Sequence, residues 1–169
     1  MMYGVVDFYR ECRANGIKPV IGCEVYVAPG SRLGRVYGVD NKYSHLILLA
    51  ENETGYKNLI YLVSMGCIEG YYYKPRVDKD LLHCHSEGII ALSACLAGEI
   101  PKALVNGDYA GAKKAAQEYV DIFGKDNFFI ELQDHGLAEQ KRIIPELIRL
   151  SEELGLGTVA TNDIHYLTA

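Results

Sequence analysis

The chain has 169 residues, of which 49% are hydrophobic and 23% are charged, and its formal net charge is −5. A chain of this size and hydrophobicity can bury the core of one ordinary domain, and we therefore expect a single globular unit. The negative balance excludes a generally basic surface that holds nucleic acid through its phosphates. Any such contact has to be local or belong to another part of the protein.

The cysteines and the apolar segments indicate the cellular compartment in which the protein is expected. Five cysteines are scattered along the chain without a CxxC pair, which argues against a disulfide framework and against a structural zinc knuckle. No apolar run reaches the roughly 18 residues that a membrane helix needs. The N-terminus also lacks the basic-then-apolar pattern of a signal peptide. We therefore expect a soluble protein of the reducing cytoplasm.

The first third of the chain shows a helix, two strands and a second helix. Residues 4–16 space their apolar side chains as a helix does and end at a glycine. Residues 18–27 form a nearly continuous β-branched run that predicts a buried strand, and a Gly-rich polar loop follows. A second strand is predicted at 45–50, then a helix at 52–66, capped by Asn52 or Thr54.

The rest of the chain continues this alternation. An aromatic stretch at 69–78 indicates a loop or short hairpin. The other predicted elements are helices at 79–85, 98–107, 108–124 and 138–155, with Asp108 as the N-cap of the third, and strands at 88–94, 127–133 and 157–161. Buried strands that alternate with helices predict an α/β fold with a mostly parallel sheet or barrel.

Potential metal ligands follow four of these strands. In α/β sheets, functional side chains gather at the carboxyl ends of parallel strands, and those ends carry Glu24, Cys95, His135, and Asp163 with His165. Residues two apart on an extended backbone point to the same side, so Asp163 and His165 can converge. Imidazole and carboxylate groups suit zinc, manganese or iron. Two such ions support phosphoester hydrolysis, and the class implied is a metal-assisted hydrolase.

Each candidate also has a structural interpretation. Glu24 can be a salt-bridged or solvated group, Cys95 a small core residue, His135 a turn residue within "QDHG", and Asp163 a cap for the segment after it. His45 opens its strand, so a purely parallel sheet would place it at the opposite rim from Glu24. An antiparallel return after the loop would bring the two together.

The stretch "YYYKPR" offers a possible local contact with nucleic acid. Tyr72 could stack on a base, while Lys74 and Arg76 could hold phosphate. Tyrosine-rich loops are also common packing devices, so both interpretations stay open. For His83 and His85, which flank a cysteine in a short polar helix, we favour a solvated surface role.

Several long motifs resemble one known family. The stretches "IKPVIGCEVYVAPGSR", "HLILLAENETGYKNL", "GYYYKPRVDKDLL", "GIIALSACLAGEIP", "NFFIELQDHGLAEQKRI" and "VATNDIHYL" together resemble the PHP (polymerase and histidinol phosphatase) domain, in the branch found at the N-terminus of the bacterial DNA polymerase III alpha subunit. The resemblance covers almost the whole chain. It implies a distorted (β/α)7-type barrel with up to three divalent ions, Mn, Zn or Fe, at one rim.

The resemblance also implies a ligand set and an activity. By position, the metal ligands would be Glu24, His45, Cys95, His135, Asp163 and His165, with Glu24, Asp163 and His165 as the catalytic residues. The implied domain activity is a metal-dependent 3′ to 5′ exonuclease that proofreads. A noncatalytic platform for the polymerase and its partner subunits is the alternative, and a free-standing phosphatase fits the polymerase-like stretches less well.

The family pattern begins with a His-x-His strand and a "TDHG"-type motif, which the 169 residues do not contain. We therefore expect residues 1–169 to be a PHP fragment whose barrel is incomplete at its N-terminal end, with the polymerase domains absent. The parent would be a DNA-directed DNA polymerase that binds primer-template DNA and other subunits of the replicative holoenzyme, with no membrane partner. The fragment alone would be inactive.

Overall fold

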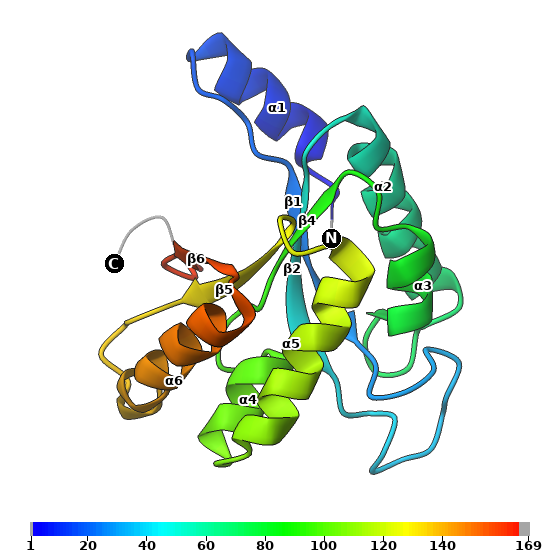
Figure 1. Cartoon of the computed structure of the whole chain (residues 1–169). Helices are drawn as coiled ribbons and strands as arrows, with labels where there is room; N and C mark the ends of the chain where they lie inside the picture. The colour runs from blue at the N-terminus through cyan, green and yellow to red at the C-terminus, as the bar shows by residue number, and fades with distance from the viewer. Residues whose placement is uncertain (1, 166–169) are drawn as a thin grey trace. The chain divides into compact units, whose positions relative to one another are not determined.

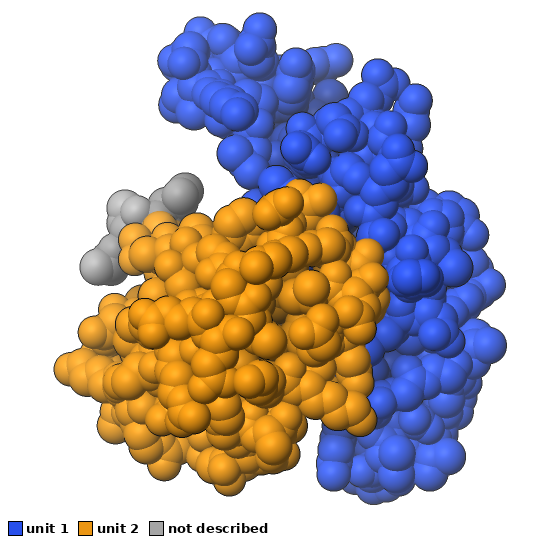
Figure 2. Space-filling model, viewed as in Figure 1, with its two compact units in different colours: residues 1–91 blue, residues 92–169 orange. Residues whose placement is uncertain are grey.

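The computed structural model describes residues 2–165. Within them, six helices and six strands alternate (Figure 1), which confirms the α/β class. The chain divides into two compact units, residues 1–91 and 92–169 (Figure 2), instead of the single globular unit that composition suggested. Neither unit closes into a barrel in the part of the chain that the structure describes. None of the helices found there is long and apolar enough to cross a membrane.

Unit 1 holds the first helices and strands. They are α1 (Val5–Ala14), β1 (Gly22–Val27), β2 (Ser44–Ala50), α2 (Glu53–Ile68), β3 (Arg76–Val77), α3 (Lys79–Cys84) and most of β4 (Ile89–Leu92). Asn52 accepts a hydrogen bond from the Gly55 amide at 3.0 Å and so caps α2, as predicted. Because this hydrogen bond satisfies a free amide in the first turn of the helix, α2 can begin directly after β2.

The strands of unit 1 are not all parallel. β1 lies between β3, which runs parallel to it, and β2, which runs antiparallel. The antiparallel pairing sets Tyr26 opposite His45 and Glu24 opposite Ile47. The expected return of the chain after the loop is thereby confirmed, and the start of β2 lies beside the end of β1.

The two faces of this sheet differ. Val25 and Val27 of β1 and Leu46 and Leu48 of β2 are buried, and α2 packs against β1, β2 and β3. Glu24 lies on the other face, because side chains alternate along a strand. Because Val25 and Val27 have to face the core, Glu24 and Tyr26 of the same strand have to point to the opposite face.

A buried arginine organises the long loop between β1 and β2. Arg76 has 0% of its surface exposed, and its guanidinium donates to the carbonyl oxygens of Arg32, Gly34, Asp40 and Gly70. Burial lowers the pKa of Arg76, and the neighbouring positive charge of Arg35 lowers it further. The guanidinium thus satisfies carbonyls that a loop without regular structure cannot pair internally.

Unit 2 contains the end of β4 and the remaining elements. They are α4 (Glu99–Val105), α5 (Tyr109–Phe123), β5 (Phe128–Leu132), α6 (Ala138–Leu154) and β6 (Gly157–Ala160). β5 and β6 pair in parallel, and α6 packs against both strands. Asp108 caps α5 through the Gly111 amide at 2.8 Å, as predicted. The core of the unit includes Tyr119, Phe128, Ile130 and Leu150.

Candidate metal centre

The antiparallel pairing in unit 1 joins two of the predicted ligands. His45 Nδ1 lies 3.2 Å from Glu24 Oε1, and the two side chains are 21% and 35% exposed. The pair is therefore half-buried, where a charge interaction is screened less than at a fully exposed site. A carboxylate and an imidazole held together are a donor set that suits a divalent ion such as zinc, manganese or iron.

Aromatic rings hold the His45 imidazole in place. Its ring centroid lies 5.1 Å from that of Tyr26 and 6.1 Å from that of Tyr43, with the Tyr43 ring nearly parallel to it. A cavity of about 490 Å³ lies along β1, between this strand, α2 and residues 74–77; Glu24 and Tyr26 line part of it, and His45 does not. This volume falls within the range of about 300–1,000 Å³ that is common for small-molecule sites.

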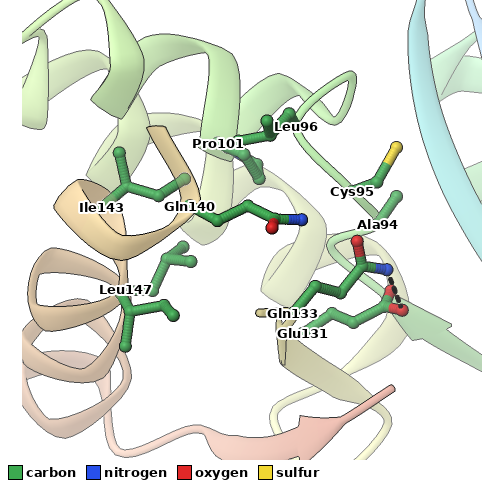
Figure 3. A pocket seen from close by; sticks show the side chains of 10 residues that line it. Ala94, Cys95, Leu96, Pro101, Glu131, Gln133, Gln140, Ile143 and Leu147 are labelled. Atoms are coloured by element: carbon green, nitrogen blue, oxygen red, sulfur yellow. Dashed lines mark hydrogen bonds between the residues drawn. The ribbon is translucent and has the colours of Figure 1, made fainter. Parts of the chain in front are cut away.

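Cys95 lies in unit 2, just after β4, and is half-buried. It follows Ala94, which adopts a positive φ of 63°, a backbone conformation that residues other than glycine seldom adopt. This turn of the backbone sends the chain from β4 toward α4. Cys95 is one of the residues that line a small pocket of about 10 Å³ in this unit (Figure 3).

Two buried polar side chains line that pocket, Glu131 of β5 and Gln133 directly after it. Glu131 Oε1 accepts hydrogen bonds from Gln133 Nε2, at 3.0 Å, and from the Thr161 hydroxyl. Within residues 2–165, Glu131 Oε2 and Gln133 Oε1 find no donor. Figure 3 shows the Gln133 amide oxygen directed toward the space between Gln140 and Cys95. Buried oxygens of this kind ordinarily bind a donor, and a space of this size fits about one water molecule.

His135 is exposed, and a buried glutamine contacts both its backbone and its ring. Its backbone N–H donates to Gln140 Oε1 at 2.8 Å, and its Nδ1 lies 2.9 Å from Gln140 Nε2. Gln140 is only 4% exposed. The histidine of "QDHG" is therefore both a turn residue, as the sequence allowed, and a side chain with a fixed ring.

Asp163 and His165 lie together after β6. His165 Nδ1 contacts the Asp163 backbone oxygen at 2.8 Å and lies 3.8 Å from its carboxylate. Both residues are exposed, and Asp163 has a positive φ of 44°. In the described part of unit 2, no three His, Cys, Asp or Glu side chains converge closely enough to hold one ion.

The three residues predicted to contact nucleic acid have different surroundings. Lys74 is exposed and Tyr72 half-buried, whereas the guanidinium of Arg76 is directed into the protein and bonded to loop carbonyls. The Arg76 guanidinium lies 5.3 Å from the centroid of the Tyr72 ring, so part of the aromatic stretch supports the buried arginine. In this structure, Arg76 organises the loop and presents no donor at the surface.

Sequence reasoning did not identify Glu131, Gln133 or Gln140 as parts of the candidate site. A signal existed for each of them. Glu131 and Gln133 stand at the carboxyl end of a predicted strand, two residues apart and therefore on one side of it. Gln140 occupies the third position of α6, where Glu and Gln side chains commonly reach back to backbone N–H groups ahead of the helix.

Comparisons with known proteins agree with the motifs. Residues 1–135 match the PHP domain family, a range that includes Glu24, His45, Cys95 and His135 but ends before Asp163. The chain is 53% identical over 166 residues to "DNA polymerase III subunit alpha" of Treponema pallidum and 47% identical over 168 residues to the protein of the same name from Thermus aquaticus. The Borreliella burgdorferi protein of that name is 44% identical over 167 residues.

These alignments cover nearly all of the chain but a small part of each relative. In each of the three, the matched region is 98% of the chain and 14% of the relative. The match to the family extends over most of the chain, from residue 1 to residue 135. The chain therefore belongs to the PHP domain family.

Proposed function

We propose that the chain is the PHP domain of a bacterial replicative DNA polymerase and that it binds divalent metal through Glu24 and His45. The observation that carries the metal site is the 3.2 Å approach of the Glu24 carboxylate to the His45 imidazole on a half-exposed sheet face. The names of the relatives support the assignment to a polymerase. Primer-template DNA and other holoenzyme subunits are the proposed partners of the full-length protein, in the bacterial cytoplasm.

The proposed activity of the full-length protein's domain is metal-dependent 3′ to 5′ phosphoester hydrolysis that removes misincorporated nucleotides. In such a reaction, bound divalent ions supply an activated water and stabilise the leaving oxygen. Glu24 and His45 would hold and orient the ion. We propose Cys95, His135, Asp163 and His165 as the further ligands of the full-length protein, and Glu24, Asp163 and His165 as its catalytic residues.

A noncatalytic platform is the second candidate, and one feature of unit 1 favours it. The loop held by Arg76 exposes Leu33, Val36, Tyr37 and Val39, which are 57–75% exposed. Exposed apolar side chains on a loop that is fixed from within are typical of protein contact surfaces. A platform role predicts that this loop, and not the metal site, limits the function of the full-length protein.

Manganese binding and exonuclease activity distinguish the two candidates. In the full-length protein, Glu24→Gln and His45→Asn should each weaken manganese binding in calorimetry at least about tenfold and abolish metal-dependent removal of a mispaired 3′ nucleotide. Glu51→Gln and His83→Asn, at exposed positions of the same unit, are the matched controls and should change neither. Unchanged manganese affinity in the Glu24 and His45 variants would refute the metal site. Intact binding without nuclease activity in the wild type would establish the platform role.

A further inference from the structure

The contact between Gln140 and His135 determines which ring nitrogen of His135 carries the proton. A backbone N–H can only donate, so the Gln140 atom 2.8 Å from the His135 amide is the oxygen. The Gln140 NH₂ group then faces His135 Nδ1 at 2.9 Å. Because an NH₂ group only donates, Nδ1 has to accept. The neutral imidazole therefore carries its hydrogen on Nε2.

The opposite amide orientation fails on the same contacts. Turning the Gln140 amide by half a rotation would set its NH₂ group against the His135 backbone N–H, two donors facing each other. Gln140 is 4% exposed, so water cannot easily replace the lost bond, and an unmet buried polar group costs about 1–3 kcal/mol. The burial of Gln140 thus holds one orientation and, through it, one tautomer.

His165 has the reverse arrangement. Its Nδ1 faces the Asp163 backbone oxygen at 2.8 Å. A carbonyl oxygen only accepts, so the neutral ring of His165 carries its hydrogen on Nδ1 and presents a lone pair on Nε2. This is the usual state of a metal-binding histidine, whose other N–H donates to a carboxylate or carbonyl.

We propose that Gln140 is a positioning residue that holds His135 in the Nε2–H tautomer, so that the ring presents a hydrogen-bond donor to an acceptor oxygen and no lone pair to a metal ion. The inference goes beyond the proposed function: for His135 it replaces the role of metal ligand with that of hydrogen-bond donor, while Cys95, Asp163 and His165 keep the ligand roles proposed above. Coordination through Nε2 of His135 would first require the Gln140 contact to break. The metal pair of Glu24 and His45 does not depend on this contact.

Nitrogen NMR of the histidine rings tests the tautomer directly. Long-range ¹H–¹⁵N spectra of the ¹⁵N-labelled chain, recorded on the neutral rings at alkaline pH, should show Nε2–H for His135 and Nδ1–H for His165. A His135→Asn variant assigns the His135 signals. In Gln140→Glu, the carboxylate accepts from both the backbone N–H and the ring, so His135 should change to Nδ1–H. Gln117→Glu, at an exposed position of α5, is the matched control and should leave both rings unchanged.

Zinc titration of the same samples supplies a second readout. Gln140→Glu should strengthen zinc binding at His135, followed by its ring signals, about tenfold, because an accepting partner leaves the Nε2 lone pair available. The proposal is overturned if wild-type His135 shows Nδ1–H, if Gln140→Glu leaves the tautomer unchanged, or if zinc binds His135 equally in both proteins. None of these outcomes would alter the manganese affinity lost in Glu24→Gln, so the two proposals fail separately.

Discussion

Replacing the buried Arg76 by alanine should be among the most destabilising single substitutions in unit 1. The guanidinium donates to the carbonyls of Arg32, Gly34, Asp40 and Gly70. A hydrogen bond from a charged donor contributes about 1.5–3 kcal/mol, but the loop carbonyls regain water once the side chain is gone, and the mutant avoids the cost of burying the charge. We expect a net loss of about 3 kcal/mol in the free energy of unfolding.

Urea denaturation measures this loss. With a slope of about 2 kcal/mol per molar urea, the midpoint should fall by about 1.5 M. Arg76→Lys should lose at least about half as much, because an ammonium cannot reach four separate carbonyls as a planar guanidinium does. Arg10→Ala, on the exposed surface of α1, is the control. Equal midpoints and slopes for Arg76→Ala and Arg10→Ala would refute the assignment of Arg76 to the loop.

Two further predictions concern packing and pH. A Cβ at Gly55 would lie 1.7 Å from the Gly88 carbonyl oxygen, so Gly55→Ala should lower the free energy of unfolding in urea by about 3 kcal/mol. Gly30 has open space around it, and Gly30→Ala, the control, should change this free energy by less than about 1 kcal/mol. Similar losses in the two variants would contradict the close packing of Gly55 against Gly88. Burial, and after it the Glu99 carboxylate, raise the pKa of Tyr119 well above its ordinary value. The neutral Tyr119 side chain therefore stabilises the fold fully below the unfolded pKa of about 10, and this stabilisation is lost as the pH rises toward the folded pKa. The unfolding free energy should therefore fall more steeply above pH 10 in the wild type than in Tyr119→Phe, and parallel curves would contradict this.

Most of the fold follows from local signals in the sequence. The caps at Asn52 and Asp108 predicted helix starts that the structure confirms. The first strand begins four residues later than predicted, at Gly22, because Val20 is hydrophobic but 56% exposed and outside the sheet. The two-residue strand β3 shows no periodicity of its own. It exists through its pairing with β1, which a local pattern cannot reveal.

The candidate site was predictable in residue type and less so in orientation. The antiparallel return considered in the sequence analysis is present, and it brings His45 to Glu24. Arg76 has the residue type of a phosphate ligand, but its donors bind the chain's own carbonyls, and composition cannot distinguish internal from external acceptors. The ring state of His135 likewise depends on Gln140, five residues later and on a helix.

The pairing of β1 with β2 links the position of Glu24 beside His45 to the stability of unit 1. A shift of the pairing by one residue would turn Val25 and Val27 out of the core and would separate Glu24 from His45 in the same movement. The state with the shifted register is therefore less stable than the native state, because it exposes these apolar side chains to water. Selection for a stable core is therefore enough to preserve the geometry of the candidate site.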